Sequence, residues 1–304
     1  MKTLKYIALA ALTISFAACT QDEDFIPQGD TDAVKISATI GKLQTRVSYD
    51  DEGNTTFDTG DFIQVENTKR TTKNKATYTY DGSSWSTTES LVWNGSSTNQ
   101  FEAWYPAYEN ASYDSFKLPT DQSSDALLTA ADWMTATTGE IATKPDNNTI
   151  NLTFKHQLTK VTVNVTTWNS EFSENNKTIT DPIIWSTGSY IEISYGTGTD
   201  GADEYTSDGS PTAINPVVSG ETFTAIVAPV KYDALTRFMT FTVDGQDLTV
   251  LTKNGILTDG LEAGKHYTFN LTVGKEVAYI SSVNITHWDE KEINGGVAEG
   301  VVTQ

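Results

Sequence analysis

Thiol chemistry is limited to one position in this 304-residue chain, because Cys19 is its only cysteine. An internal disulfide would need a second cysteine, so the fold must be stabilised by a packed core. Cys19 directly follows an apolar run, residues 6–18, which begins after Lys2 and Lys5 and ends in two alanines. The run is too short to cross a bilayer as a permanent helix and is typical of an exported chain.

The basic start, the apolar run and the cysteine together resemble a bacterial lipoprotein signal. The resemblance implies that residues 1–18 are a signal peptide and that Cys19 is acylated as the first residue of the mature protein. Palmitate is the expected kind of modification, and the lipid would be the membrane anchor. The alternative is an ordinary secretory signal in which Cys19 has no role.

An acidic cluster, Asp22, Glu23 and Asp24, follows the cysteine. It resembles the export signal by which Bacteroidetes send lipoproteins to the outer face of the outer membrane. The alternative is a simple acidic tether. With Pro27 and few apolar residues, residues 19–32 are predicted to be a linker that holds the body off the membrane.

Metal and acid–base chemistry have little support. The three histidines, His156, His266 and His287, are scattered, and none has a second ligand at metal-binding spacing. The acid-rich segment 200–209 could offer oxygen ligands to calcium, but its spacing matches no calcium loop, and a solvated loop is favoured. We predict no metal and no cofactor.

Catalysis and nucleic-acid binding are both disfavoured. The chain has no G-x-S-x-G motif, and the GLEAGK stretch at 260–265 has the wrong spacing for a phosphate loop. We therefore predict no enzymatic activity; an enzyme on a β scaffold is the least supported alternative. The formal net charge of −20 disfavours nucleic acid, since phosphate binding needs clustered lysines and arginines.

The elements that carry these residues are predicted to be strands. In the first run, Val34, Ile36, Ala38 and Ile40 alternate with polar residues, which is the pattern of a strand with one buried face. Helical periodicity is nearly absent, and residues 125–135 could form one or two turns. The pattern predicts an all-β fold of antiparallel sandwich architecture. Further alternating runs lie at 152–165, 223–227, 238–243, 266–273 and 279–285, and Asp244-Gly245 predicts a hairpin turn between two of them.

Two domains fit the length and the long polar breaks better than one. We predict an N-terminal β-sandwich domain at 33–155 and a C-terminal one at 156–304 that ends in a flexible, glycine-rich tail. The boundary carries an error of about fifteen residues, since boundaries are the least certain part of such a prediction.

Several segments, in order along the chain, resemble the Bacteroidetes fimbrillin family, the Mfa-like fimbrial lipoproteins. The similarity covers nearly the whole mature chain. It implies two transthyretin-like β-sandwich domains in tandem. The matching segments are RVSY at 46–49, GDFIQV at 60–65, AWYP at 103–106, FKHQLTKV at 154–161 and GKHYTFNL at 264–271, with Ile285 and Trp288 beyond them.

The resemblance also implies a mode of assembly. Surface lipoproteins of this family lose an N-terminal segment by proteolysis after a basic residue, and a strand of the next subunit then fills the vacated site. In this chain the residue cut would be Arg46, and residues 33–40 would form the removed strand. Alternatively, Arg46 is a plain surface residue beside an ordinary first strand. The donor would be a C-terminal strand or the tail at 289–304.

The expected function is therefore a structural subunit of a cell-surface fimbria (pilus), whose partners are other fimbrial subunits and, through the lipid, the outer membrane. The sequence does not separate stalk, tip and anchor roles. The alternative is a tip adhesin or glycan-binding lipoprotein that does not polymerise and binds a ligand on a host or bacterial surface. For that alternative, an aromatic group could form a stacking platform, although aromatic residues in β-sandwiches usually belong to the core, which is the favoured interpretation. Its members would be Trp85, Trp93, Trp104, Tyr105 and Tyr108.

Overall fold

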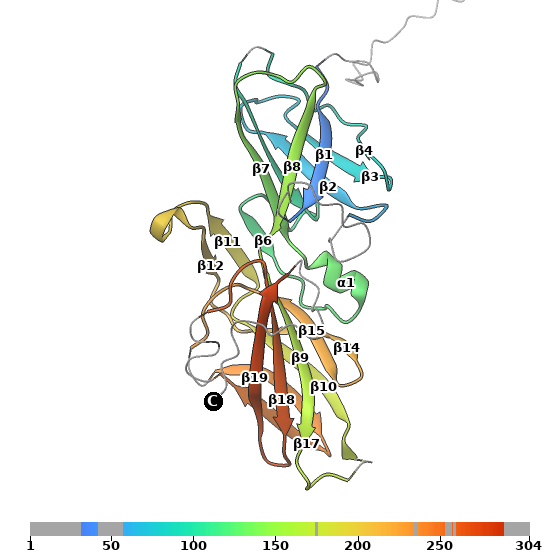
Figure 1. Cartoon of the computed structure of the whole chain (residues 1–304), viewed down its shortest axis with the longest axis vertical. Coiled ribbons are helices and arrows are strands. Elements are labelled where there is room, and N and C mark those ends of the chain that lie inside the picture. The colour runs from blue at the N-terminus through green and yellow to red at the C-terminus, as the bar shows by residue number, and fades with distance from the viewer. Residues whose placement is uncertain are drawn as a thin grey trace, which may run out of the picture.

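The computed structural model describes residues 32–41, 57–95, 97–173, 176–233, 236–252, 257 and 260–288. Within these residues nearly every regular element is a strand, and the single α-helix, α1 (Asp125–Ala130), is short. The prediction of an all-β fold is confirmed. Figure 1 shows an elongated molecule in which two β-rich bodies lie end to end.

The upper body in Figure 1 is built on one sheet of seven strands. In chain order they are β1 (Lys35–Ile40), β2 (Phe62–Asn67), β3 (Lys75–Tyr80), β4 (Trp85–Ser86), β5 (Asn99–Tyr105), β7 (Met134–Ile141) and β8 (Thr149–His156). The order across the sheet is β1-β8-β7-β5-β2-β3-β4, so β1 lies at one edge. Side chains on the inward face form a first hydrophobic core, with Trp93, Phe101 and Phe154 among its largest members.

The lower body is a sandwich of two further sheets. Its strands are β9 (Thr159–Trp168), β10 (Ile179–Ser186), β13 (Thr212–Ile214), β14 (Val217–Ser219), β15 (Thr222–Val227), β16 (Arg237–Val243), β17 (Gln246–Leu251), β18 (Lys265–Val273) and β19 (Ala278–His287). One sheet has the order β14-β15-β9-β18-β19, and the other β13-β10-β16-β17. Val163 and Phe269 of the first sheet and Ile184 and Phe241 of the second share a second hydrophobic core.

A small third sheet lies at the junction of the two bodies, and in Figure 1 its strands β11 and β12 lie on the opposite side of the molecule from α1. It contains β6 (Ser115–Lys117), β11 (Tyr190–Ser194) and β12 (Glu204–Ser207), in the order β12-β11-β6, with the 3-10 helix η2 (Thr199–Gly201) in the turn between β11 and β12. Phe116 of β6 stacks on Trp133, and both belong to the second core. Residues that precede position 155 thus pack with the lower body, and a domain boundary at 155 stays a prediction.

The long alternating run at 152–165 is divided between the two bodies. Its first part lies in β8 and its second part in β9, with Gln157 and Leu158 between them. Leu152 and Phe154 point into the first core, whereas Val161 and Val163 point into the second. Since the alternation continues across the break, the pattern alone did not show where one sheet ends and the next begins.

Most strand pairs are antiparallel, as the sequence predicted, but two are parallel. β1 pairs with β8 in parallel, and β9 pairs with β18 in parallel. Parallel neighbours need a long connection, and both pairs join segments far apart in the chain. Local alternation carries no information about such partners. The predicted hairpin at Asp244-Gly245 is confirmed between β16 and β17, where both residues have a positive φ (49° and 74°).

Candidate assembly site

The first strand, β1, is attached to the upper body along one edge. It pairs with β8 over its whole length, from Lys35 opposite Thr149 to Ile40 opposite Phe154. Backbone hydrogen bonds continue past both ends of the pairing: Lys35 N–H donates to the Asn148 carbonyl (3.0 Å), and Gly41 N–H donates to the Phe154 carbonyl (2.9 Å). Figure 1 shows β1 lying alongside β8 on the upper body.

Apolar side chains of β1 contribute to the first core. Val34 precedes the strand and is buried, with 4% of its surface exposed. Ile36, Ala38 and Ile40 are half-buried and pack against the same core, whereas the residues between them are exposed. Alternation along the strand thus gives β1 one side that closes the core and one side that faces water. Without β1, the edge of β8 and this part of the core would be uncovered.

The segment before β1 is held by a second set of contacts. Val34 N–H donates to the Leu91 carbonyl (3.0 Å), and Trp93 N–H donates to the Asp32 carbonyl (2.9 Å). The Asp32 carboxylate also forms an ion pair with the Lys144 ammonium group, at 2.7 Å. The strand is therefore anchored at its start as well as along its length.

Tyr78 of β3 donates a hydrogen bond from its hydroxyl to the Val34 carbonyl, at 2.8 Å. Burial, with a smaller effect from Glu89, raises the pKa of Tyr78 well above its ordinary value, so the hydroxyl keeps its proton and remains a donor. Sequence reasoning missed Tyr78. The alternation in residues 75–80 could mark its side chain as buried, but it does not identify the carbonyl that accepts its proton.

The predicted lipidation and processing residues lie outside the described residues. These are Cys19 and Arg46, together with residues 19–31 of the acidic tether and the tail after Trp288. The order along the chain is informative by itself, because Arg46 falls between β1 and β2. A cut after Arg46 would remove the covalent link between β1 and the rest of the upper body.

At the other end of the chain, β19 is an integral part of the lower body. It pairs with β18 from Ala278 to His287, and Ala278, Ile280 and Val283 belong to the second core. Ile285, near its end, is 44% exposed. Leaving this sheet would cost β19 both its ladder and its core contacts, so β19 itself would be a costly donor.

The histidines are each engaged in structural contacts. His156 Nδ1 lies 2.7 Å from Asp132 Oδ1, and the imidazole stacks on Trp288 with ring centroids 4.3 Å apart. His266 Nε2 lies 2.9 Å from the Thr162 hydroxyl. Burial, with the Lys160 ammonium group nearby, lowers the pKa of His266 to about 4, so this ring is neutral at pH 7.

Carboxylates of the acid-rich segment 200–209 stabilise turns. Asp203 accepts a hydrogen bond from Gly196 N–H (3.0 Å), and Asp208 accepts one from Ser189 N–H (3.1 Å). Nowhere in the described part of the chain do three metal-ligating side chains come together. Nor does this part contain a helix long and apolar enough to cross a membrane.

The aromatic platform considered for the adhesin alternative is not formed, and the favoured interpretation as core residues is confirmed for most of the group. Trp93, Trp104 and Tyr105 are buried, and Trp85 is half-buried in edge contact with Phe57. Only Tyr108, at 43%, is widely exposed. The strands that carry these residues turn them toward the interior, where aromatic rings bury large apolar surfaces.

These features define a class of protein: an all-β chain with two hydrophobic cores, in which the N-terminal edge strand fills a place along the first core. A family model for fimbrillin-like proteins matches residues 45–288. The chain therefore belongs to the fimbrillin-like family.

Solved structures share the fold of this chain. A proposed cell adhesion protein from Bacteroides uniformis is similar with a TM-score of 0.56 and 20% identity, over 84% of this chain and 98% of that one. Another from Bacteroides ovatus has a TM-score of 0.57 and 14% identity, over 86% of this chain and 99% of that one. Comparison with curated proteins gives no match.

Proposed function

We propose that this chain is a structural, non-catalytic subunit of a cell-surface fimbria that polymerises by strand exchange. In this proposal, proteolysis after Arg46 releases the N-terminal segment up to Arg46, which contains β1, and a strand from the next subunit takes the place of β1. Membership of the fimbrillin-like family supports a fimbrial role and interaction with other fimbrial subunits.

One observation supports strand exchange most strongly: the position of β1. It is an edge strand, it is bonded in parallel to β8 alone among the strands, and its apolar side closes the first core. An uncovered strand edge beside an apolar surface is a template for another strand, which gains both backbone hydrogen bonds and buried area. The incoming strand would need the alternation that Val34, Ile36, Ala38 and Ile40 provide.

The lipoprotein part of the proposal rests on the sequence around Cys19. Acylation there would hold the subunit at the outer membrane until the cut after Arg46 separates the body from its anchor. The cut after Arg46 would then both release the subunit from the membrane and make it competent to assemble. Labelling cells with a palmitate analogue tests this step: wild-type protein should carry the label and a Cys19→Ala variant should not.

Processing can be tested with an arginine-specific protease and purified protein. The chain has three arginines, Arg46, Arg70 and Arg237. Arg70 donates hydrogen bonds to the Thr72 and Trp93 carbonyls (3.1 and 2.9 Å), which hold its side chain in place. The Arg237 guanidinium stacks on the Trp185 ring. We expect mass spectrometry to show a cut after Arg46, followed by filaments in electron micrographs.

The matched variants are Arg46→Gln and Arg70→Gln. The first should block both cleavage and filament formation, whereas the second should leave both unchanged. Filaments formed by the Arg46→Gln variant, or formed after a cut elsewhere, would contradict the proposal.

A further inference from the structure

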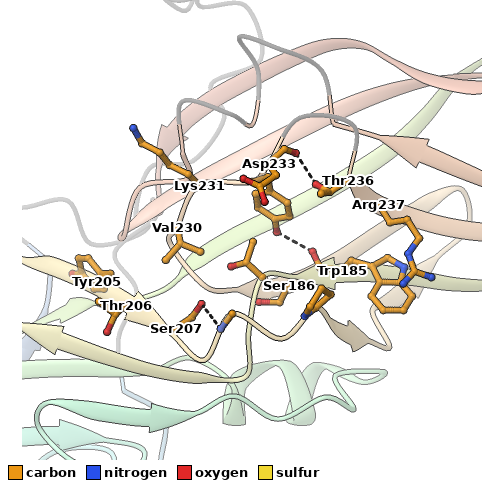
Figure 2. Close-up of a pocket in the computed structure, with 14 residues that line it drawn as sticks. Trp185, Ser186, Tyr205, Thr206, Ser207, Val230, Lys231, Asp233, Thr236 and Arg237 are labelled. Atoms are coloured by element: carbon orange, nitrogen blue, oxygen red, sulfur yellow. Dashed lines mark hydrogen bonds between the residues drawn. The ribbon is translucent and has the colours of Figure 1, made fainter.

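A cavity of about 690 Å³ lies in the lower body, on the side that faces the small third sheet. Figure 2 shows that its walls come from segments far apart in the chain: the end of β10, strand β12, and residues 230–233, 236 and 237 before and at the start of β16. Cavities of this size hold small organic ligands. Neither the strand exchange nor the lipid anchor involves this cavity.

A stacked cation forms one wall. The Arg237 guanidinium carbon lies 3.9 Å from the centroid of the Trp185 ring. The ring is fixed, because Trp185 Nε1 donates to the Thr240 hydroxyl (3.1 Å) and the Trp185 carbonyl accepts from the Tyr232 hydroxyl (2.9 Å). Stacking uses the flat face of a guanidinium and leaves its N–H groups free in the plane.

The charge of this wall contrasts with that of the chain. Against a formal net charge of −20, the cavity is lined by two cations, Arg237 and Lys231, and one carboxylate, Asp233. Among the described residues, neither cation forms an ion pair. A free guanidinium held in one orientation is suited to bind a carboxylate through two parallel hydrogen bonds.

The rest of the lining suits a ligand rich in hydroxyl groups. The Asp233 carboxylate lines the cavity and can accept hydrogen bonds from ligand hydroxyl groups, and the rings of Trp185 and Tyr205 offer apolar surface. Polar groups beside aromatic rings match the alternating polar and apolar faces of a sugar.

We propose that this cavity binds a carboxylated sugar. The sugar carboxylate accepts hydrogen bonds from Arg237, and a sugar hydroxyl group donates to the Asp233 carboxylate. Uronic acids and sialic acids share this chemistry, so either could supply the ligand. The proposal is independent of strand exchange, because the cavity lies in the lower body and β1 in the upper one.

The test is a titration of the purified protein with glucuronic acid and with N-acetylneuraminic acid, followed by calorimetry and by saturation-transfer NMR. Glucose is the neutral reference. We expect at least one acid to bind, with an affinity that falls as salt is added, and glucose not to bind. Whichever acid binds more tightly identifies the kind of sugar.

Variants locate the binding at Arg237. Arg237→Gln should weaken binding about tenfold or more, since it removes a charge-assisted contact. Arg237→Lys should recover part of the loss, because it keeps the charge but not the paired donors. Lys117→Gln, an equal loss of charge at an exposed position of β6, should change little. If Arg237→Gln does not fold, the lysine variant and the salt dependence still test the site.

Three results would overturn the proposal. The first is that neither acid binds at millimolar concentration. The second is that glucose binds as tightly as the acids. The third is that every foldable Arg237 variant binds as tightly as the wild type.

Discussion

Contacts of individual residues stabilise the attachment of β1 to the upper body, and the hydrogen bond from Tyr78 to the Val34 carbonyl is the clearest example. The donor is buried, and its hydroxyl keeps its proton over the physiological pH range. Sequence alternation could identify Tyr78 as a core residue, but the bond depends on tertiary structure. The same limit applies to the aromatic residues that were considered as a stacking platform. The type of a residue does not tell which side of a sheet it faces.

Removing the Tyr78 hydroxyl should therefore destabilise the upper body. Tyr78→Phe leaves a carbonyl without its donor, which costs about 1–2 kcal/mol of the free energy of unfolding. Urea denaturation measures the change. Tyr190→Phe is the control, since Tyr190 is exposed, and it should cost almost nothing. Equal stability of the two variants would show that the bond does not hold the strand.

His266 leads to a second prediction at the scale of residues, which concerns the pH dependence of the protein's stability. Its folded-state pKa of about 4 lies below the ordinary value of about 6.5, so the unfolded chain binds a proton first as the pH falls. Stability from this residue is thus present above pH 6.5 and is lost as the pH falls toward 4, by up to roughly 3 kcal/mol.

Urea denaturation at several pH values compares His266→Gln with wild type. The variant should lose less stability between pH 7 and pH 4. Thr39→Ala, a change at an exposed residue that does not titrate, should follow the wild-type curve. An unchanged pH dependence in His266→Gln would show that the buried ring is not responsible.

At the scale of elements, the alternating pattern predicted most strands but not their partners. Residues 33–40 were expected to form a removable strand, and β1 does form at 35–40. Its parallel pairing with β8, more than a hundred residues away, left no local signal. For the same reason the sequence did not indicate the cavity, whose walls come from β10, β12 and the start of β16.

The contacts of β1 predict how its side chains control its release. Ile36→Ala removes part of the apolar side that packs on the first core, at a cost of about 1–2 kcal/mol, less than for a fully buried isoleucine. After cleavage at Arg46, the N-terminal fragment should leave about tenfold faster. Gel filtration with mass spectrometry follows the fragment over time.

Thr39→Ala is the matched control, because Thr39 lies on the same strand and is exposed. Its fragment should leave at the wild-type rate. Equal release from both variants would mean that the backbone ladder alone retains β1.

At the scale of the whole molecule, the proposed strand exchange involves both bodies. The strand that we propose is replaced, β1, lies at an edge of the upper body, whereas β19 of the lower body ends at the junction of the two bodies, where Trp288 stacks on His156 of β8 (Figure 1). If a segment at or beyond β19 enters the site of β1 in another copy, the two contact surfaces differ, and a head-to-tail contact of that kind continues into a filament when it does not close into a ring.

The most direct test of strand exchange uses a synthetic peptide with the sequence of residues 32–41. Protein cleaved after Arg46 and stripped of its own fragment is mixed with the peptide, binding is followed by fluorescence anisotropy, and filament formation is scored by electron microscopy. A peptide carrying Ile36→Asp is the control. Our account predicts that the native peptide binds the cleaved protein and blocks filaments, while the control does neither. Filaments that grow equally well in the presence of bound native peptide would contradict it.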